Sequence, residues 1–239
     1  MTTPTFHQCT QGSPEWLALR CGMLTASEMK LIMTPKLKPA DNDKSRSHLY
    51  ELLAQRITGY VEPSYISDDM LRGTADEVRA RALYAEKYAP VEEVGFVTRE
   101  FTRGEMTITL GCSPDALVLD TSGIEAKSRR QKYQIETILG IARGVFCPEE
   151  YVLQVQTCML ITDRRKWDFV SYSGGLPMVV AEVGADVGIQ AAILDNCFAA
   201  EEKLQAMRAV YDSTVAKYGW HPTERVIETE GETQVSEEE

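Results

Sequence analysis

Two acids and a lysine near the middle of the chain have a spacing that suits hydrolytic chemistry. Asp115 ends residues 111–115 (GCSPD), and Glu125 and Lys127 lie in residues 123–127 (GIEAK). If 123–127 is a strand, its side chains alternate, so Glu125 and Lys127 face one way and Ala126 faces the core. A preceding hairpin strand would bring Asp115 beside Glu125. The sequence therefore predicts a patch of two carboxylates and a lysine.

Two adjacent carboxylates repel each other, and a divalent cation removes the conflict. Magnesium suits carboxylate and carbonyl oxygens and usually keeps waters and phosphate oxygens as further ligands. Such an ion lowers the pKa of a bound water and stabilises a phosphoryl transition state, while Lys127 orients the water or balances negative charge. The patch is thus typical of a phosphodiesterase. A turn aspartate followed by a solvated Glu/Lys strand face explains the same fragment without any function.

Helices are expected on both sides of this patch. Ser13 and Pro14 have the types of an N-cap and a first helical residue. Spacing predicts a helix over 67–88 with Ala75, Val78, Ala82 and Ala85 on one face. The other expected helices cover 26–33, the region of Leu49 to Ile57, 131–142, 148–161 and 185–218.

Short strands are expected at 94–98, 106–112, 115–119, 123–127, 167–172 and 177–183. This order predicts an α/β fold with a central mixed β-sheet flanked by helices. We expect one domain over residues 1–222 and an acidic, disordered tail over 223–239.

Composition narrows the class of protein. The chain has 239 residues, 44% of them hydrophobic, which is enough for a sizeable core. No apolar run is long enough to span a membrane, and the first residues lack the features of a signal peptide, so a cytoplasmic location without membrane contact is expected. Six cysteines without a C-x-x-C pair are interpreted as reduced thiols, and three scattered histidines do not favour histidine-based chemistry.

The net charge of −11 argues against a general polyanion binder, but it is unevenly distributed. Residues 223–239 carry −6, which leaves −5 for the remainder. A body this mildly acidic can bind nucleic acid through local basic patches, especially where a metal neutralises its acids.

The central fragment fits the PD-(D/E)xK nuclease pattern, and the wider sequence resembles the viral-recombinase exonuclease family typified by bacteriophage lambda exonuclease. The resemblance covers about residues 11–215. It rests on ordered motifs at 12–20 (GSPEWLALR) with Gly22, 25–28 (TASE), 73–77 (GTADE), 112–115 (CSPD), 125–127 (EAK) and 151–156 (YVLQVQ) with Met159. The resemblance implies a restriction-endonuclease-like nuclease core.

Roles for individual residues follow from the same resemblance. Asp115, Glu125 and the Ala126 carbonyl match metal ligands, and Glu77 matches a glutamate that approaches the metals from the opposite wall. Lys127 matches the catalytic lysine and Gln154 a glutamine that lines the site. The implied cofactor is Mg²⁺, with Mn²⁺ as an alternative, and two ions per active site.

Residues that would grip DNA are also implied. Arg20, Ser27 and Ser113 match the residues that hold the 5′-phosphate. Met70 or Leu71 would be an apolar wedge that separates the strands, although Arg72 stands where the best-known relative has an aromatic residue. The basic residues Lys36, Lys38, Arg129 and Arg130 are candidates for phosphate contacts, and a solvated charge run explains each cluster equally well.

The resemblance therefore implies a processive 5′→3′ exonuclease. It would digest one strand of linear double-stranded DNA from a 5′-phosphorylated end and leave a 3′ strand for annealing-type recombination. A homotrimeric ring, a single-strand annealing protein as partner and a phage or prophage origin are further implications. The alternatives are a site-specific endonuclease of the same superfamily and a non-catalytic protein that binds DNA ends.

Overall fold

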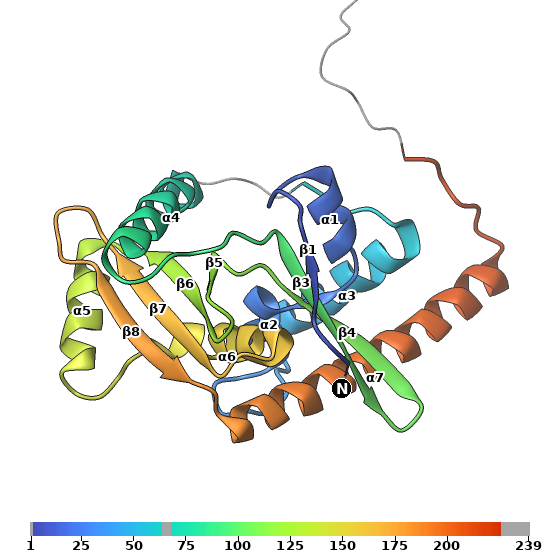
Figure 1. Ribbon diagram of the computed structural model, residues 1–239. Helices are drawn as coiled ribbons and strands as arrows, with labels where there is room; N and C mark the ends of the chain where they lie inside the picture. Colours follow the sequence, from blue (N-terminus) through green and yellow to red (C-terminus); the bar gives the residue numbers. More distant parts are fainter. Residues whose placement is uncertain (1, 64–67, 226–239) are drawn as a thin grey trace, which may run out of the picture.

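The computed structural model describes residues 2–63 and 68–225, and for residues 68–70 it describes the backbone only. Two four-stranded sheets lie side by side, with helices around them (Figure 1). The predicted α/β architecture of mixed strands and flanking helices is confirmed. The prediction of a disordered tail falls largely on residues 226–239, which lie outside the described residues.

The first sheet has the strand order β1-β3-β4-β2. β2 runs parallel to β4, and the other two pairings are antiparallel. Its strands are β1 (Thr5–His7), β2 (Leu24–Thr25), β3 (Phe96–Arg103) and β4 (Met106–Cys112).

The second sheet has the order β5-β6-β7-β8, in which only β6 and β7 are parallel. Its strands are β5 (Ala116–Val118), β6 (Ser122–Ser128), β7 (Lys166–Tyr172) and β8 (Val179–Gly184). Because β4 ends at Cys112 and β5 begins at Ala116, only the link Ser113–Asp115 joins the two sheets at this point.

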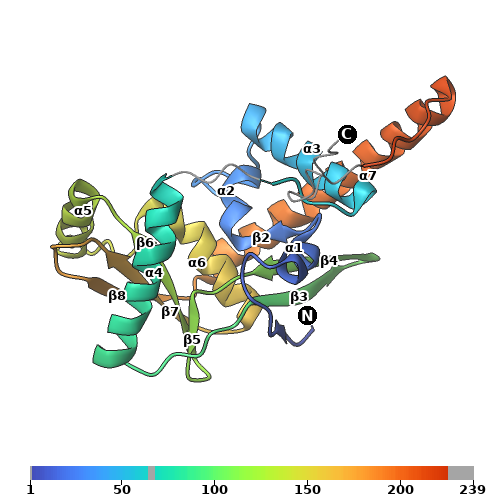
Figure 2. The same cartoon turned by 90° about the horizontal axis from the view of Figure 1, so that it is seen from above.

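Helix α6 ties the two sheets together. It packs against β3 and β4 of the first sheet and against β6 and β7 of the second. α4 covers the second sheet through a smaller core that contains Ala80, Tyr84 and Ala126, and α7 runs along the far side of α6 (Figure 2). The helices are α1 (Pro14–Arg20), the short 3₁₀ turn η1 (Ala26–Glu28), α2 (Met29–Ile32), α3 (Asp43–Thr58), α4 (Asp68–Lys87), α5 (Gln131–Ile141), α6 (Glu149–Thr162) and α7 (Val187–Tyr218).

Most sequence-based elements are present with small shifts of their ends. The predicted cap is confirmed, since the Trp16 backbone N–H donates to Ser13 Oγ at 3.2 Å. The strands β1 and β2 were not predicted. All six cysteines are free thiols, four of them buried. Among the described residues, no helix combines the length and apolarity that crossing a bilayer requires.

The expected orientation of α4 is wrong. The predicted apolar face is exposed, with Val78 at 53% of its possible surface. Asp76, Ala80 and Tyr84 are buried instead, and Tyr84 donates a hydrogen bond to Asp168 of β7. α4 therefore turns a partly polar face toward the second sheet, and Glu77 is half-buried next to that face.

Candidate active site

The β5–β6 hairpin brings the two central acids together. Ala116 pairs with Ile124 in antiparallel register, which sets Asp115 across from Glu125. The Ala126 backbone N–H donates to Asp115 Oδ2 at 2.5 Å. The Ala126 side chain packs in the core beneath α4, as the alternation of strand side chains predicts.

Glu125 is the most buried of the acids, with 1% of its surface exposed. Its Oε1 pairs with the Lys127 ammonium and accepts a hydrogen bond of 2.6 Å from Gln154 Nε2 of α6. Its Oε2 is buried and has no protein partner. Lys127 also lies over the ring of Tyr151, 5.4 Å from the ring centroid.

Glu77 reaches the same cluster from α4. It is in hydrogen-bond contact with the Asp115 side chain. Arg81 Nη1, one helical turn on, lies 3.5 Å from Glu77 Oε1 and donates to the Asp115 carbonyl at 3.1 Å. Three carboxylates from a helix, a link and a strand thus converge on the ammonium of Lys127.

Burial and mutual repulsion shift the protonation of these acids. Burial, followed by the charge of Glu77, raises the pKa of Asp115 to about 7. Burial and the charge of Asp115 raise the pKa of Glu125 to about 7, although Lys127 opposes this shift. Burial acts to lower the pKa of Lys127, but the charges of Glu125 and Asp115 outweigh it and raise that pKa. Without a cation, full ionisation of these acids near neutral pH is therefore unfavourable.

These residues fit a hard divalent cation. The unpartnered Glu125 Oε2 beside Asp115 offers carboxylate oxygen that no protein donor satisfies. In the described part of the chain, no group of three or more His, Cys, Asp or Glu side chains is arranged to hold a metal ion by itself. Magnesium does not need such a group, because it binds through one or two carboxylates and keeps waters and phosphate oxygens. Asp115, Glu125, Glu77 and the Ala126 carbonyl are the candidate ligands.

A polar pocket adjoins the acids on the side of α1. The Arg20 guanidinium stacks on Trp16 at 4.4 Å from the ring centroid and donates to Thr25 Oγ1 at 3.5 Å. The Trp16 indole N–H donates to Ser113 Oγ at 2.8 Å, and Ser27 Oγ lies 3.4 Å from Thr25 Oγ1. The arrangement gathers a guanidinium and three hydroxyls, a set that matches a phosphate group.

One cavity of about 240 Å³ joins this pocket to the acids. It is lined by the proposed phosphate residues Arg20, Ser27 and Ser113 and by Asp115, Glu125, Lys127 and Gln154. A larger cavity of about 850 Å³, between the N-terminal segment and α4, shares Gln11, Trp16 and Asp115 with it and is also lined by Glu77.

The remaining predicted residues whose side chains the structure describes are not among those that line these two cavities. Leu71 is 59% exposed near the start of α4, and the Met70 side chain lies outside the described residues. Lys36 and Lys38 are exposed between α2 and α3, and Arg130 is exposed at the start of α5.

Arg129 differs from these surface cations because it is buried. It donates to Glu150 Oε1 at 2.8 Å and to the Tyr151 hydroxyl at 3.1 Å. This position braces β6 against α6 and does not present the guanidinium to solvent.

Sequence reasoning missed three residues of the site. Trp16 and Thr25 lie inside the motifs at 12–20 and 25–28. The i, i+4 spacing of Trp16 and Arg20 on a helix could have predicted that their side chains stack. Arg81 follows Glu77 at the same spacing, but nothing in the sequence connects it to the Asp115 carbonyl.

The chain resembles known proteins in both sequence and structure. Residues 15–165 match the model of the YqaJ-like viral recombinase domain. No curated protein matches the sequence. The alkaline exonuclease LHK-Exo from Laribacter hongkongensis is 34% identical over 86% of this chain and 100% of its own, with a TM-score of 0.71, and the values are the same for its complex with dAMP.

A phage related exonuclease from Haemophilus somnus is 14% identical over 79% of this chain and 96% of its own, with a TM-score of 0.55, and shows the fold alone. The predicted nuclease fold and the resemblance to viral-recombinase exonucleases are thereby confirmed. The chain belongs to the YqaJ-like viral recombinase family, and this membership implies a nuclease.

Proposed function

We propose that the protein is a metal-dependent 5′→3′ exonuclease that digests one strand of duplex DNA from a 5′-phosphorylated end. One observation carries the proposal: the guanidinium and hydroxyls suited to a phosphate share a single cavity with the carboxylates and lysine suited to hydrolysis. A site built to hold a terminal phosphate beside its cutting residues needs a DNA end. The relative LHK-Exo has been crystallised with dAMP, a mononucleotide of the kind that exonucleolytic digestion releases.

Binding begins with the terminal phosphate. Arg20 is half-buried, and burial lowers its pKa, yet it stays charged and has Trp16 beneath it. Its guanidinium and the hydroxyls of Ser27 and Ser113 would hold the phosphate dianion. Because Ser113 and Asp115 are two residues apart on one link, this grip sets the next phosphodiester beside the acids.

Hydrolysis then depends on the acids and Lys127. Mg²⁺ or Mn²⁺, as one or two ions held by Asp115, Glu125, Glu77 and the Ala126 carbonyl, would supply a more acidic water and positive charge for the transition state. Lys127 stays protonated because Glu125 and Asp115 raise its pKa, so its ammonium can orient the attacking water or balance charge. Gln154 fixes Glu125 Oε1, which leaves Oε2 available for the cation.

The wider assembly belongs to the same proposal. A homotrimeric ring around the duplex would keep a mildly acidic protein on DNA, and a single-strand annealing protein would take the 3′ strand. Leu71 or Met70 would separate the strands, and Lys36, Lys38 and Arg130 would contact phosphates. The body outside residues 223–239 carries only −5, which supports retention by topology more than by charge.

The test is digestion of end-labelled linear duplexes with magnesium, comparing 5′-phosphate ends, 5′-hydroxyl ends and covalently closed circles. We expect release of mononucleotides from the phosphorylated 5′ strand and none from circles. Cutting of closed circles would instead establish an endonuclease, and binding without hydrolysis would establish a non-catalytic end-binding protein.

A further inference from the structure

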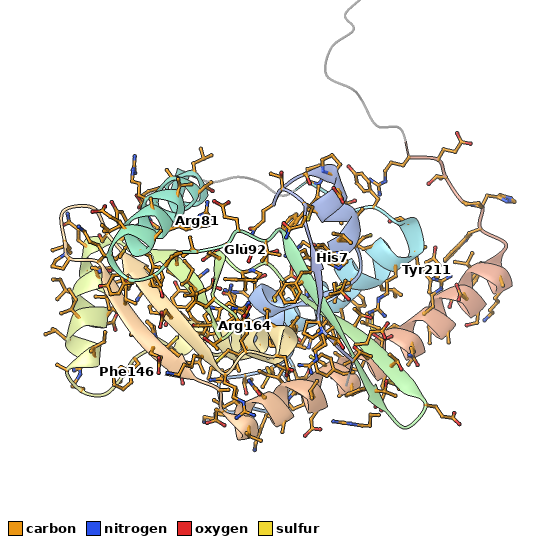
Figure 3. The ribbon with its side chains drawn as sticks, viewed as in Figure 1. His7, Arg81, Glu92, Phe146, Arg164 and Tyr211 are labelled. Carbon is orange, nitrogen blue, oxygen red and sulfur yellow. The ribbon has the colours of Figure 1, made fainter. Side chains whose placement is uncertain are left out.

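Arg81 occupies a position that the chemistry above does not use. It lies on α4, and Figure 3 labels it together with Glu92 of the segment that leads to β3. Its Nη1 donates to the Asp115 carbonyl at 3.1 Å and lies 3.5 Å from Glu77 Oε1. Its Nη2 lies 3.3 Å from Glu93 Oε2. One side chain therefore connects a helix, the link between the sheets and the segment before β3.

The contact with Asp115 is to the backbone, not to the carboxylate. It fixes where the Asp115 main chain lies relative to α4, while the Ala126 N–H fixes the Asp115 side chain from the other direction. Arg81 is only 17% exposed, so its contacts are partly shielded from water.

We propose that Arg81 is a positioning residue that holds Glu77 and Asp115 at the separation a divalent cation requires. The inference rests on the proposed metal-dependent function. Two effects of Arg81 on a cation have opposite signs. Its positive charge repels the cation, whereas its hydrogen bonds assemble the cation's ligands. The positioning effect should outweigh the repulsion, because the Arg81 guanidinium contacts the Asp115 carbonyl, Glu77 and Glu93 at once and so fixes two candidate ligands relative to each other.

The two effects can be separated by whether a substitution of Arg81 raises or lowers the affinity for the cation. Arg81→Gln removes the charge and the fork of donors. If repulsion dominated, the variant would bind cations more tightly. Because we infer that positioning dominates, we expect the apparent affinity for the cation to fall about tenfold. Loss of a residue that orients metal ligands typically lowers metal affinity by about 10–100-fold, and this value is the lower end of that range. Arg81→Lys keeps the charge but cannot span the Asp115 carbonyl and Glu93 with one nitrogen, so it should weaken cation binding as well.

The experiment measures cation binding without DNA. The full chain is titrated with Mg²⁺ or Ca²⁺ while its melting temperature is followed, and the same variants are assayed for digestion over a range of Mg²⁺. We expect both Arg81 variants to need about tenfold more cation for half of the melting shift, and to recover most of their turnover at high Mg²⁺. A purely structural loss would lower turnover at every Mg²⁺ concentration.

Arg79→Gln is the matched control. It removes the same charge from the same helix. Arg79 contacts Asp76 at 3.1 Å, whereas Arg81 contacts Glu77 and the Asp115 carbonyl. Unchanged or tighter cation binding in both Arg81 variants would overturn the inference. If Arg81→Gln does not fold, the lysine variant decides the question in the same way. Absence of any cation-induced shift in the wild-type protein would instead refute the metal site of the proposed function.

Discussion

Asp115→Asn tests the electrostatics of the site through stability alone. Burial and Glu77 raise the pKa of Asp115 from 3.8 to about 7. This rise in pKa means that ionising Asp115 destabilises the metal-free fold by about 4 kcal/mol. Burying the new amide costs about 1–2 kcal/mol, since its oxygen can accept from the Ala126 N–H and its NH₂ can donate to Glu77. We therefore expect the variant to be more stable than the wild type by about 2–3 kcal/mol at pH 8.

The sign of the pH dependence follows from the direction of the shift. An acid with a raised folded-state pKa binds protons more tightly when folded, so wild-type stability falls as pH rises from about 4 to about 7. Near pH 4 the Asp115→Asn variant should therefore be less stable than the wild type by the cost of the buried amide, about 1–2 kcal/mol. Its advantage should appear as the pH rises and be complete above pH 7. Chemical denaturation in a chelator across this range measures it. Thermal melting should show a difference of about 4–12 °C at pH 8 for a chain of this size.

The same variant should lose digestion and most of its stabilisation by Mg²⁺. It would gain stability and lose function together, as is common where a site gathers like charges. An Asp115→Asn protein that is equally or less stable at pH 8 in chelator would show that the acids are not in conflict, and the reasoning on the cation would fail with it.

Four further predictions follow from the geometry. Because Lys127 is not a candidate ligand, Lys127→Ala should keep the melting shift induced by Mg²⁺ yet lose most turnover, by about 100-fold or more; a normal rate of digestion would remove it from the mechanism. Arg20→Ala should abolish the preference for 5′-phosphate over 5′-hydroxyl ends in competition digests, and an unchanged preference would contradict the phosphate pocket. Mg²⁺ should raise the melting temperature more at pH 8 than at pH 6, since protons compete for Asp115 and Glu125, whose pKa values are about 7; equal shifts would argue against these ligands. Gly123→Ala would place a Cβ 2.4 Å from the buried Trp167 ring and should cost about 1–3 kcal/mol in urea denaturation, whereas Gly174→Ala, with open space at its Cβ, should be nearly neutral.

The sequence predicted the structure correctly where a single local rule, such as the alternation of side chains along a strand, determines it. Strand alternation correctly set Ala126 into the core and Glu125 beside Asp115, because a hairpin register leaves few alternatives. The presence of the helices could also be predicted, from the helical spacing of apolar residues and from the Ser13 cap. The strands β1 and β2, of three and two residues, are too short to show any period.

Errors arose where contacts between distant segments overrode the local pattern. α4 exposes its alanine-rich face because Asp76, Ala80 and Tyr84 face the second sheet instead, so the apolar stripe indicated the wrong side. Arg129 was predicted to contact phosphates or to belong to a solvated charge run. It is buried instead, because its partner Glu150 lies on α6 and only folding brings the two together. The ring, the metal ions and the annealing partner have no signature in one chain's composition, so they stay predictions.

The link Ser113–Asp115 has a consequence for the size of the product. On the proposed function, the hydroxyl that holds the DNA end and the acid that supports the cut are two residues apart on the three-residue link between β4 and β5. The number of nucleotides removed in each cycle would then be set by the main-chain distance between Ser113 and Asp115. Substitutions around the pocket would change how firmly an end is held, but only an insertion or deletion within this link would change how much is cut away.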